Sequence, residues 1–261
     1  MARPSRPDDE TTRIAQRYAR RARAAAAGQA DRYSLLRPEV WQTVQERQRA
    51  MLGLFARHGW HDLAQRQIVE VGCGAGGNLL ELLRAGVRPE HLCGLELMAD
   101  RHAQARAVLP ERVALHLGDA CAAPLAAESV DLVLQSTVFS SLLDDTFQQR
   151  LADTMWRWVR PGGAVLWYDF TWNNPRNRDV RGVPLARVRA LFPQGRIEAQ
   201  RLTLAPPLAR AACRLSPTLY PLLNALPLLR THVLAWIGKD LSPDTRGERG
   251  QRPREGRGRR S

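Results

Sequence analysis

The chain has 261 residues, of which 39 are basic and 26 acidic, so its formal net charge at pH 7 is +13. Its apolar fraction of 44% and charged fraction of 25% are ordinary for a globular protein. They exclude a wholly disordered chain, a collagen and a small disulfide scaffold. The length predicts one domain with extra segments at its ends.

The positive charge is concentrated at the two ends of the chain. Eight of the thirteen net charges lie in residues 1–32 and 244–261, and Lys239 is the only lysine. We predict a flexible basic N-terminal arm over residues 1–32 and a disordered Arg/Gly-rich tail over 241–261. Basic ends of this kind bind nucleic acid or anionic membranes, although an arginine bias also fits a GC-rich coding sequence.

Apolar segments and the spacing of the cysteines give an expectation for the cellular compartment. The N-terminus has no apolar run typical of a secretory signal, and prolines and arginines interrupt the most apolar region, residues 202–237. A transmembrane segment is therefore not expected. The four cysteines are far apart in the sequence and form no CxxC pair, which argues against a metal site or a disulfide framework. We predict a cytoplasmic, reducing location.

Elements in chain order indicate a doubly wound α/β fold. Helical spacing of apolar residues predicts an amphipathic helix over 33–58, within an N-terminal cap of residues 33–60. Short apolar strands then alternate with helices, which predicts βαβ units and a mostly parallel, Rossmann-like sheet of seven strands with helices on both faces. The expected strands are 68–71, 92–96, 113–117, 130–135 and 164–170, and the expected helices between them are 78–84, 99–108 and 146–159.

Beyond residue 170 the pattern loosens. A helix over 184–192 and strands over 196–204 and 232–237 complete a single domain of residues 33–240. A Pro-rich insert within residues 202–230 precedes the last strand. We expect the insert to pack on the edge of the sheet; capping an acceptor pocket and lying on a membrane surface are the alternatives.

A glycine-rich turn follows the first strand. Gly72, Gly74 and Gly77 satisfy GxGxxG, the pattern of a dinucleotide site in which a helix N-terminus faces a pyrophosphate. Glu70, however, stands at the end of the strand, two residues before the first glycine. Its carboxylate repels a pyrophosphate and suits a ligand that carries an ammonium group.

The segment from Glu70 to Gly76 reads Glu-x-Gly-x-Gly-x-Gly and resembles the first motif of the class I S-adenosylmethionine-dependent methyltransferases. Later segments agree in order: Glu96 ends the second strand, Gly118-Asp119-Ala120 follows the third, Ser129–Val133 opens the fourth, and Val159–Gly163 precedes the fifth. The resemblance covers roughly residues 60–170. It implies S-adenosylmethionine as the cofactor, with Glu96 near the ribose hydroxyls and Asp119 near the adenine amino group. The implied cofactor-binding residues are Glu70, Gly72, Cys73, Gly74, Gly76, Asn78, Glu96, Leu97, Asp119, Ala120, Gln135 and Ser136.

Residues 135–141 after the fourth strand, and 167–170, 173–175 and 181–182 in and after the fifth, also resemble a bacterial small-molecule subgroup. These methyltransferase type 11-like enzymes are associated with glycoconjugate gene clusters. We therefore expect a small-molecule or glycan acceptor, with O-methylation favoured. The candidate acceptor-binding residues are Phe139, Asn173, Asn174 and Arg181. Asp169, at the end of the fifth strand, is the candidate catalytic base or acceptor-orienting group, because open α/β sheets bind ligands at that edge.

Three alternatives remain from the sequence, one of which is a non-catalytic nucleic-acid-binding protein that acts through its Arg-rich ends. The basic ends keep an RNA acceptor open, with an affinity expected to fall steeply with salt. An NAD(P)-dependent oxidoreductase would use the same glycine turn, but Glu70 and the absence of a Tyr-x-x-x-Lys pair argue against it.

Overall fold

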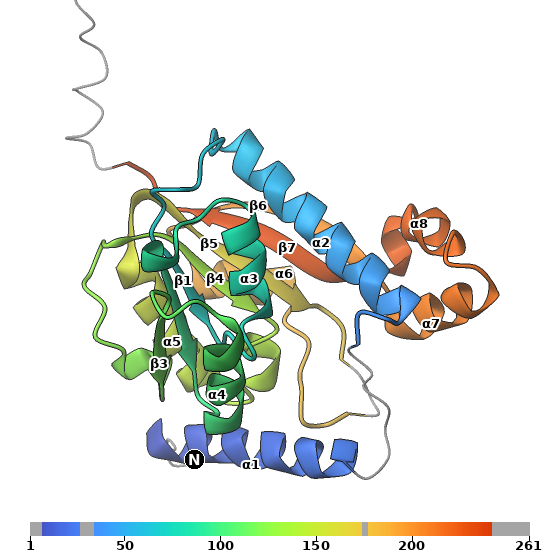
Figure 1. Ribbon diagram of the computed structural model, residues 1–261, viewed down its shortest axis with the longest axis horizontal. Coiled ribbons are helices and arrows are strands. Elements are labelled where there is room, and N and C mark those ends of the chain that lie inside the picture. Colours follow the sequence, from blue (N-terminus) through green and yellow to red (C-terminus); the bar gives the residue numbers. More distant parts are fainter. Residues whose placement is uncertain (1–6, 27–33, 174–176, 242–261) are drawn as a thin grey trace, which may run out of the picture.

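The computed structural model describes residues 7–26, 34–173 and 177–241 (Figure 1). Its centre is a sheet in which, within these ranges, seven strands lie in the order β3-β2-β1-β4-β5-β7-β6. The strands are β1 (Ile68–Val71), β2 (Leu92–Glu96), β3 (Ala114–Leu117), β4 (Val130–Ser136), β5 (Val159–Phe170), β6 (Arg196–Leu204) and β7 (Arg230–Gly238). The order reverses between β1 and β4, so their carboxyl ends open on the crevice where such sheets bind ligands.

Strand direction matches the sequence pattern. Strands β1 to β5 pair in parallel, whereas β7 is antiparallel to both β5 and β6. Every residue of β1 and β2 is buried, as expected for strands covered on both faces. The predicted seven-stranded, mostly parallel Rossmann-like sheet is confirmed.

Helices cover both faces of the sheet. The α-helices are α1 (Pro7–Ala26), α2 (Pro38–Arg57), α3 (Gly77–Arg84), α4 (Ala99–Val108), α5 (Asp145–Trp158), α6 (Leu185–Leu191), α7 (Pro206–Leu215) and α8 (Leu219–Asn224). Short 3-10 turns are η1 (Pro89–His91), η2 (Ala120–Ala122), η3 (Phe139–Ser141) and η4 (Pro227–Leu229). One apolar core joins the sheet to α2, α3 and α4, a second joins it to α1, α5 and α6, and a third, smaller one joins β6 to α7 and α8.

Local signals set the helix boundaries. Pro38 occupies the first turn of α2, where its missing N–H costs nothing. Asp144 caps α5, because its carboxylate accepts a hydrogen bond from Phe147 N at 2.8 Å. Strand β5 begins at Val159, five residues earlier than expected, and Val159 pairs with Val130 ahead of a register shift.

The prediction of a flexible N-terminal arm is wrong for residues 7–26, which form α1. Glu10, Ile14 and Arg17 are buried, so this helix is docked on the core. The sequence did not indicate this docking, because the segment is polar overall and some of its contacts with the core are made by charged side chains. The remainder of the predicted arm, residues 1–6 and 27–32, and the tail from 242 onward lie outside the described residues.

The Pro-rich insert contains α7, α8 and η4. In Figure 1 these elements lie at one end of the molecule, beside the first turns of α2. Gln42 of α2 donates a hydrogen bond to Pro217 O between α7 and α8. Across the described ranges, no helix has the length and apolar character needed to cross a membrane.

Candidate cofactor-binding site

The glycine turn connects β1 to α3. Gly72, Gly74 and Gly76 have φ values of 67°, 57° and 86°, a left-handed conformation that glycine adopts without steric cost. The N–H groups of Gly72 and Cys73 both donate to Leu95 O, at 2.8 and 3.1 Å, which ties the turn to the neighbouring strand β2. The turn is therefore a fixed element of the sheet edge.

Glu96 fixes the turn from the end of β2. Its side chain is 5% exposed, and its two carboxylate oxygens accept hydrogen bonds from Gly74 N and Met98 N, each at 2.8 Å. The residue predicted to bind ribose hydroxyls thus also holds the glycine turn and the start of α4 in place.

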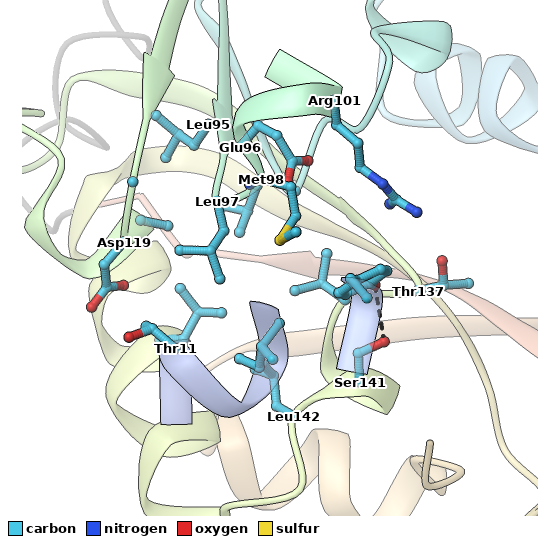
Figure 2. Close-up of a pocket in the computed structure, with 18 of the residues that line it drawn as sticks. Thr11, Leu95, Glu96, Leu97, Met98, Arg101, Asp119, Thr137, Ser141 and Leu142 are labelled. Carbon is cyan, nitrogen blue, oxygen red and sulfur yellow. Dashed lines mark hydrogen bonds between the residues drawn. The ribbon is translucent and has the colours of Figure 1, made fainter. Parts of the chain in front are cut away.

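A cavity opens at the carboxyl ends of β1, β2 and β4 (Figure 2). It contains about 750 Å³ of space between protein atoms, part of it open to solvent, which is within the usual range for a small-molecule site. Figure 2 shows Leu97 and Met98 entering it from the end of β2, with Asp119 on one side and Thr137 and Ser141 on the other. Six of the predicted cofactor residues line it: Gly72, Glu96, Leu97, Asp119, Ala120 and Ser136.

Asp119 lies at the cavity rim and has two protein partners. Its carboxylate accepts from Cys121 N at 2.9 Å and from the Arg150 guanidinium at 2.8 Å. These bonds hold Asp119 and the adjoining turn η2 in a fixed orientation toward the cavity.

Helix α1 closes one side of the cavity. Thr11, Ile14 and Tyr18 line it and follow one another at helical spacing, so they share one face of α1. Tyr18 Oη lies 3.2 Å from Ser141 Oγ, the contact drawn as a dashed line in Figure 2, and the Arg101 guanidinium packs 4.5 Å from the centre of the Tyr18 ring.

Polar side chains anchor α1 beside the cavity. The Arg17 guanidinium donates to the Glu10 carboxylate at 2.8 Å and to Ser141 O at 2.9 Å, and Glu10 also accepts from Leu143 N at 3.3 Å. Since Glu10 and Arg17 are almost fully buried, this ion pair leaves neither charge unmatched in the interior.

Glu70 lies buried beneath the glycine turn. Asn78 donates to one carboxylate oxygen at 2.5 Å, whereas the other oxygen is buried without a hydrogen-bond partner. Burial is the main reason that the pKa of Glu70 is raised to about 8. Arg47 of α2 donates to Asn78 Oδ1 at 2.6 Å and pairs with Glu81 at 3.3 Å. Helix α2 therefore fixes the position of Asn78, the hydrogen-bond donor to Glu70.

The end of β4 contributes a strained segment. Gln135 is fully buried, and its side-chain oxygen accepts from Val138 N at 3.1 Å, while Ser136 and Thr137 reach the cavity. Thr137 has a φ of 57°, which is uncommon for a β-branched residue and is found most often where a functional site requires it.

The predicted acceptor residues are not brought together at the cavity. Phe139 is buried against Trp167, Asn173 accepts a hydrogen bond from Gly182 N, and Arg181 pairs with Asp145. Asn174 lies outside the described residues.

Asp169 is fully buried and points toward η3. Its carboxylate accepts from Ser140 N at 3.0 Å and from Phe170 N at 2.9 Å. Burial raises the pKa of Asp169 to about 7. This placement gives Asp169 the geometry of an anchor for the η3 segment, whose Ser141 lines the cavity.

Several lining residues were missed from the sequence. They are Thr11, Ile14, Met98, Arg101, Thr137, Val138 and Leu142, together with Phe147 and Leu151 of α5. The spacing of Thr11, Ile14 and Tyr18 was an available signal, because it marks one face of a helix within the supposed arm.

The residues present fit S-adenosylmethionine. Glu96 and Asp119 offer carboxylate acceptors at the cavity, and the unpartnered buried oxygen of Glu70 lies beneath the turn. A methyl group added at Gly74 would meet no protein atom within 4 Å, so the turn leaves room for close approach of a ligand. The Glu96 and Asp119 carboxylates favour a ligand with hydroxyl and amine donors over a pyrophosphate, and an ammonium group beside Glu70 would favour its ionised form.

Comparisons with known proteins agree with this fit. Residues 68–163 match the family model described as a methyltransferase domain. No curated protein matches the sequence.

Three solved structures illustrate the similarity of fold. An S-adenosylmethionine-dependent methyltransferase from Archaeoglobus fulgidus is 13% identical, with 75% of this chain and 96% of that chain covered and a TM-score of 0.53. A putative sarcosine dimethylglycine methyltransferase from Galdieria sulphuraria is 14% identical, with coverages of 78% and 89% and a TM-score of 0.54. A phosphoethanolamine N-methyltransferase from Haemonchus contortus, in complex with S-adenosylhomocysteine, is 19% identical, with coverages of 74% and 53% and a TM-score of 0.52.

The matched segment identifies a methyltransferase domain, and the sheet order and the glycine turn with its acidic neighbours agree with the fold of S-adenosylmethionine-dependent methyltransferases. The protein is a methyltransferase, and S-adenosylmethionine fits its cavity as the methyl donor. The oxidoreductase alternative is thereby set aside.

Proposed function

We propose that the enzyme transfers the methyl group to an oxygen of a small-molecule or glycan acceptor. The observation that carries this proposal is a polar cluster beside Ser136, formed by Arg47, Tyr168, Thr203 and His232 and here called the acceptor cluster. Its residues come from α2, β5, β6 and β7, next to the end of β4 that reaches the cofactor cavity.

Hydrogen bonds and ring contacts connect the acceptor cluster to the cavity wall. Arg47 donates to Ser136 Oγ at 3.4 Å, and its guanidinium lies 5.5 Å from the centre of the Tyr168 ring. Tyr168 stacks on His232 at 5.1 Å, and its hydroxyl lies 2.7 Å from Thr203 Oγ1. Hydroxyl and guanidinium groups in this arrangement suit the hydrogen-bonding pattern of a polyhydroxylated acceptor.

S-adenosylmethionine supplies a methyl group already activated by its sulfonium, so the protein mainly aligns the acceptor and excludes water. A hydroxyl acceptor also has to lose its proton. Burial, and to a lesser degree the charge of Arg47, lowers the pKa of His232 to about 4. The imidazole is therefore neutral at pH 7. Because the same burial makes it a weak base, it takes the proton only as methyl transfer develops positive charge on the hydroxyl oxygen.

The geometry favours His232 over Asp169 as the base. The carboxylate of Asp169 is already engaged by two backbone N–H groups on the opposite side of β5. We propose instead that Asp169 acts on the reaction through the position of η3, and that Glu96, Asp119 and Glu70 contribute to cofactor binding.

A cytoplasmic location is the corresponding proposal for the compartment. The four cysteines are free thiols, three of them buried, which suits a reducing environment.

The acceptor class is tested with S-adenosylmethionine carrying a ¹³C-methyl group and three acceptor pools: hydroxylated saccharides, small amines and total tRNA. We expect label in the saccharide pool, with the methyl carbon at the chemical shift of a methyl ether. Label in the amine pool, or in tRNA with a steep salt dependence, would contradict the proposed acceptor while leaving the methyltransferase class intact.

The role of His232 is tested by His232→Gln. We expect kcat to fall about 10²- to 10⁴-fold while the affinity for S-adenosylmethionine is unchanged. Asp169→Asn is the comparison variant. A larger loss of kcat in Asp169→Asn than in His232→Gln, with both variants folded, would reverse the assignment.

A further inference from the structure

The end of the molecule built from α7, α8 and η4 exposes a concentration of leucines. Of the twelve large hydrophobic side chains that are exposed among the described residues, five lie between residues 206 and 229. They are Leu208 (39% exposed), Leu215 (82%), Leu222 (66%), Leu226 (55%) and Leu228 (87%). We call these five side chains the leucine patch. Exposed apolar side chains gathered in one short segment mark interaction surfaces, whereas single exposed leucines are ordinary.

The segment that carries the leucine patch is packed on the core, so its exposed leucines belong to a folded, ordered surface. Its inner side buries Ala209, Ala212 and Cys213 of α7 and Tyr220 of α8. Glu46 of α2 receives hydrogen bonds from the Tyr220 hydroxyl at 3.0 Å and from Asn224 Nδ2 at 2.7 Å.

The outer side of α7 combines apolar and basic side chains. Leu208, Ala211 and Leu215 are exposed at positions i, i+3 and i+7 and so form one stripe along the helix. Arg210 and Arg214, also exposed, are four residues apart and lie beside that stripe.

The segment that carries the leucine patch is itself basic, while Glu39 and Glu46 of α2 lie against it. From residue 199 to residue 239 the sequence contains four arginines and one lysine but no aspartate or glutamate. Exposed leucines together with arginines match a partner surface that is anionic and also accepts apolar side chains. A second copy of the same surface does not match it, because an isologous contact would bring like-charged arginines together without an acidic residue of the segment to pair with them.

We propose that the leucine patch and Arg210 and Arg214 of α7 dock the enzyme on the surface of an anionic lipid bilayer. The leucines enter the boundary between headgroups and acyl chains, and the arginines pair with lipid phosphates. The contact is peripheral. It does not depend on the identity of the methyl acceptor or on the proposed role of His232.

Docking is tested with the full chain by co-sedimentation with vesicles of phosphatidylcholine alone and with vesicles that contain 30% phosphatidylglycerol. We expect binding to the anionic vesicles that weakens as salt is raised. The double variant Leu215→Glu/Leu228→Glu is expected to lower the partition coefficient about tenfold or more, because it removes two inserted side chains and adds two negative charges at the contact.

The matched control is Val108→Glu/Leu117→Glu, which adds the same two charges at side chains that are 52% and 55% exposed on α4 and β3. It is expected to bind vesicles nearly as well as the unaltered protein. Both double variants should retain calorimetric binding of S-adenosylmethionine, which shows that each is folded.

Three results would overturn the proposal. The first is that the protein does not sediment with anionic vesicles at low salt. The second is that both double variants lose vesicle binding equally, which would assign binding to net charge. The third is that the protein binds no vesicles but forms a dimer in solution that only Leu215→Glu/Leu228→Glu dissociates. The last result would make a second copy of the chain the occupant of the leucine patch.

Discussion

Gly72 and Gly74 provide a matched pair for measuring what the glycine turn requires. Both have positive φ values, of 67° and 57°, so alanine at either position pays the cost of a left-handed backbone, about 1–2 kcal/mol. The two positions differ in their surroundings. A Cβ at Gly72 would lie 2.6 Å from Val138 Cγ2, whereas a Cβ at Gly74 would meet no protein atom within 4 Å.

Gly72→Ala therefore adds overpacking, which costs about 1–3 kcal/mol, to the backbone cost. We expect it to lower the free energy of unfolding by about 2–5 kcal/mol, and Gly74→Ala by only about 1–2 kcal/mol. Urea unfolding measures both, with an unchanged slope expected in each case. The double variant Gly72→Ala/Val138→Ala should recover part of the difference, since it removes the overlapping methyl group. Equal destabilisation by Gly72→Ala and Gly74→Ala would refute this reading of the turn.

Three further predictions concern the cofactor site, the acceptor cluster and helix α1. Glu96→Gln removes the charge from an acceptor of two backbone N–H groups, so calorimetry should show about 10- to 150-fold weaker S-adenosylmethionine binding, with the exposed Glu90→Gln as an unaffected control. Burial lowers the pKa of His232 to about 4, so the contribution of the neutral imidazole to stability is complete above about pH 6.5 and is lost as the pH falls toward 4. His232→Gln should reduce this loss of stability in acid by up to about 3 kcal/mol in unfolding experiments. An unchanged dependence of stability on pH would show that the imidazole titrates normally. Arg17→Met removes the nearest cation from the buried Glu10 carboxylate and leaves it with Arg13 at 3.9 Å and the Leu143 N–H. We expect up to about 3–5 kcal/mol of destabilisation or detachment of α1, detected as faster amide exchange there. Unaltered exchange and stability would contradict the docked ion pair.

The sequence predicted the sheet and the glycine turn well because their signals are local. The run from Ile68 to Val71 is apolar and β-branched apart from Glu70, and the glycines that follow leave few other backbone conformations. The order of the later landmarks, Glu96 and Asp119, then placed two acidic side chains at the same edge of the sheet. Both line the cavity in the structure.

The sequence did not predict the cover of the cavity, for a physical reason. Helix α1 is docked partly through a buried ion pair between Glu10 and Arg17 and a hydrogen bond to a main-chain oxygen in η3. In a sequence, such charged residues look the same as those of a solvated arm. Their partner segment lies more than 120 residues away, so no local pattern marks the contact.

The surroundings of Asp169 could not be predicted from the sequence for a related reason. Asp169 ends a strand at the correct edge, but successive side chains of a strand point to opposite faces of the sheet. Tyr168 therefore faces α2 and the acceptor cluster, whereas Asp169 faces η3. Which of two neighbouring residues reaches the reacting atoms depends on the helices packed on each face, and these are set by long-range contacts.

The central claim is that the cavity beside the glycine turn binds S-adenosylmethionine. Isothermal titration calorimetry of the full chain, with S-adenosylmethionine and with NADH, tests it most directly. The account predicts saturable binding of one S-adenosylmethionine per chain and no heat of binding for NADH. Saturable NADH binding together with no response to S-adenosylmethionine would contradict it.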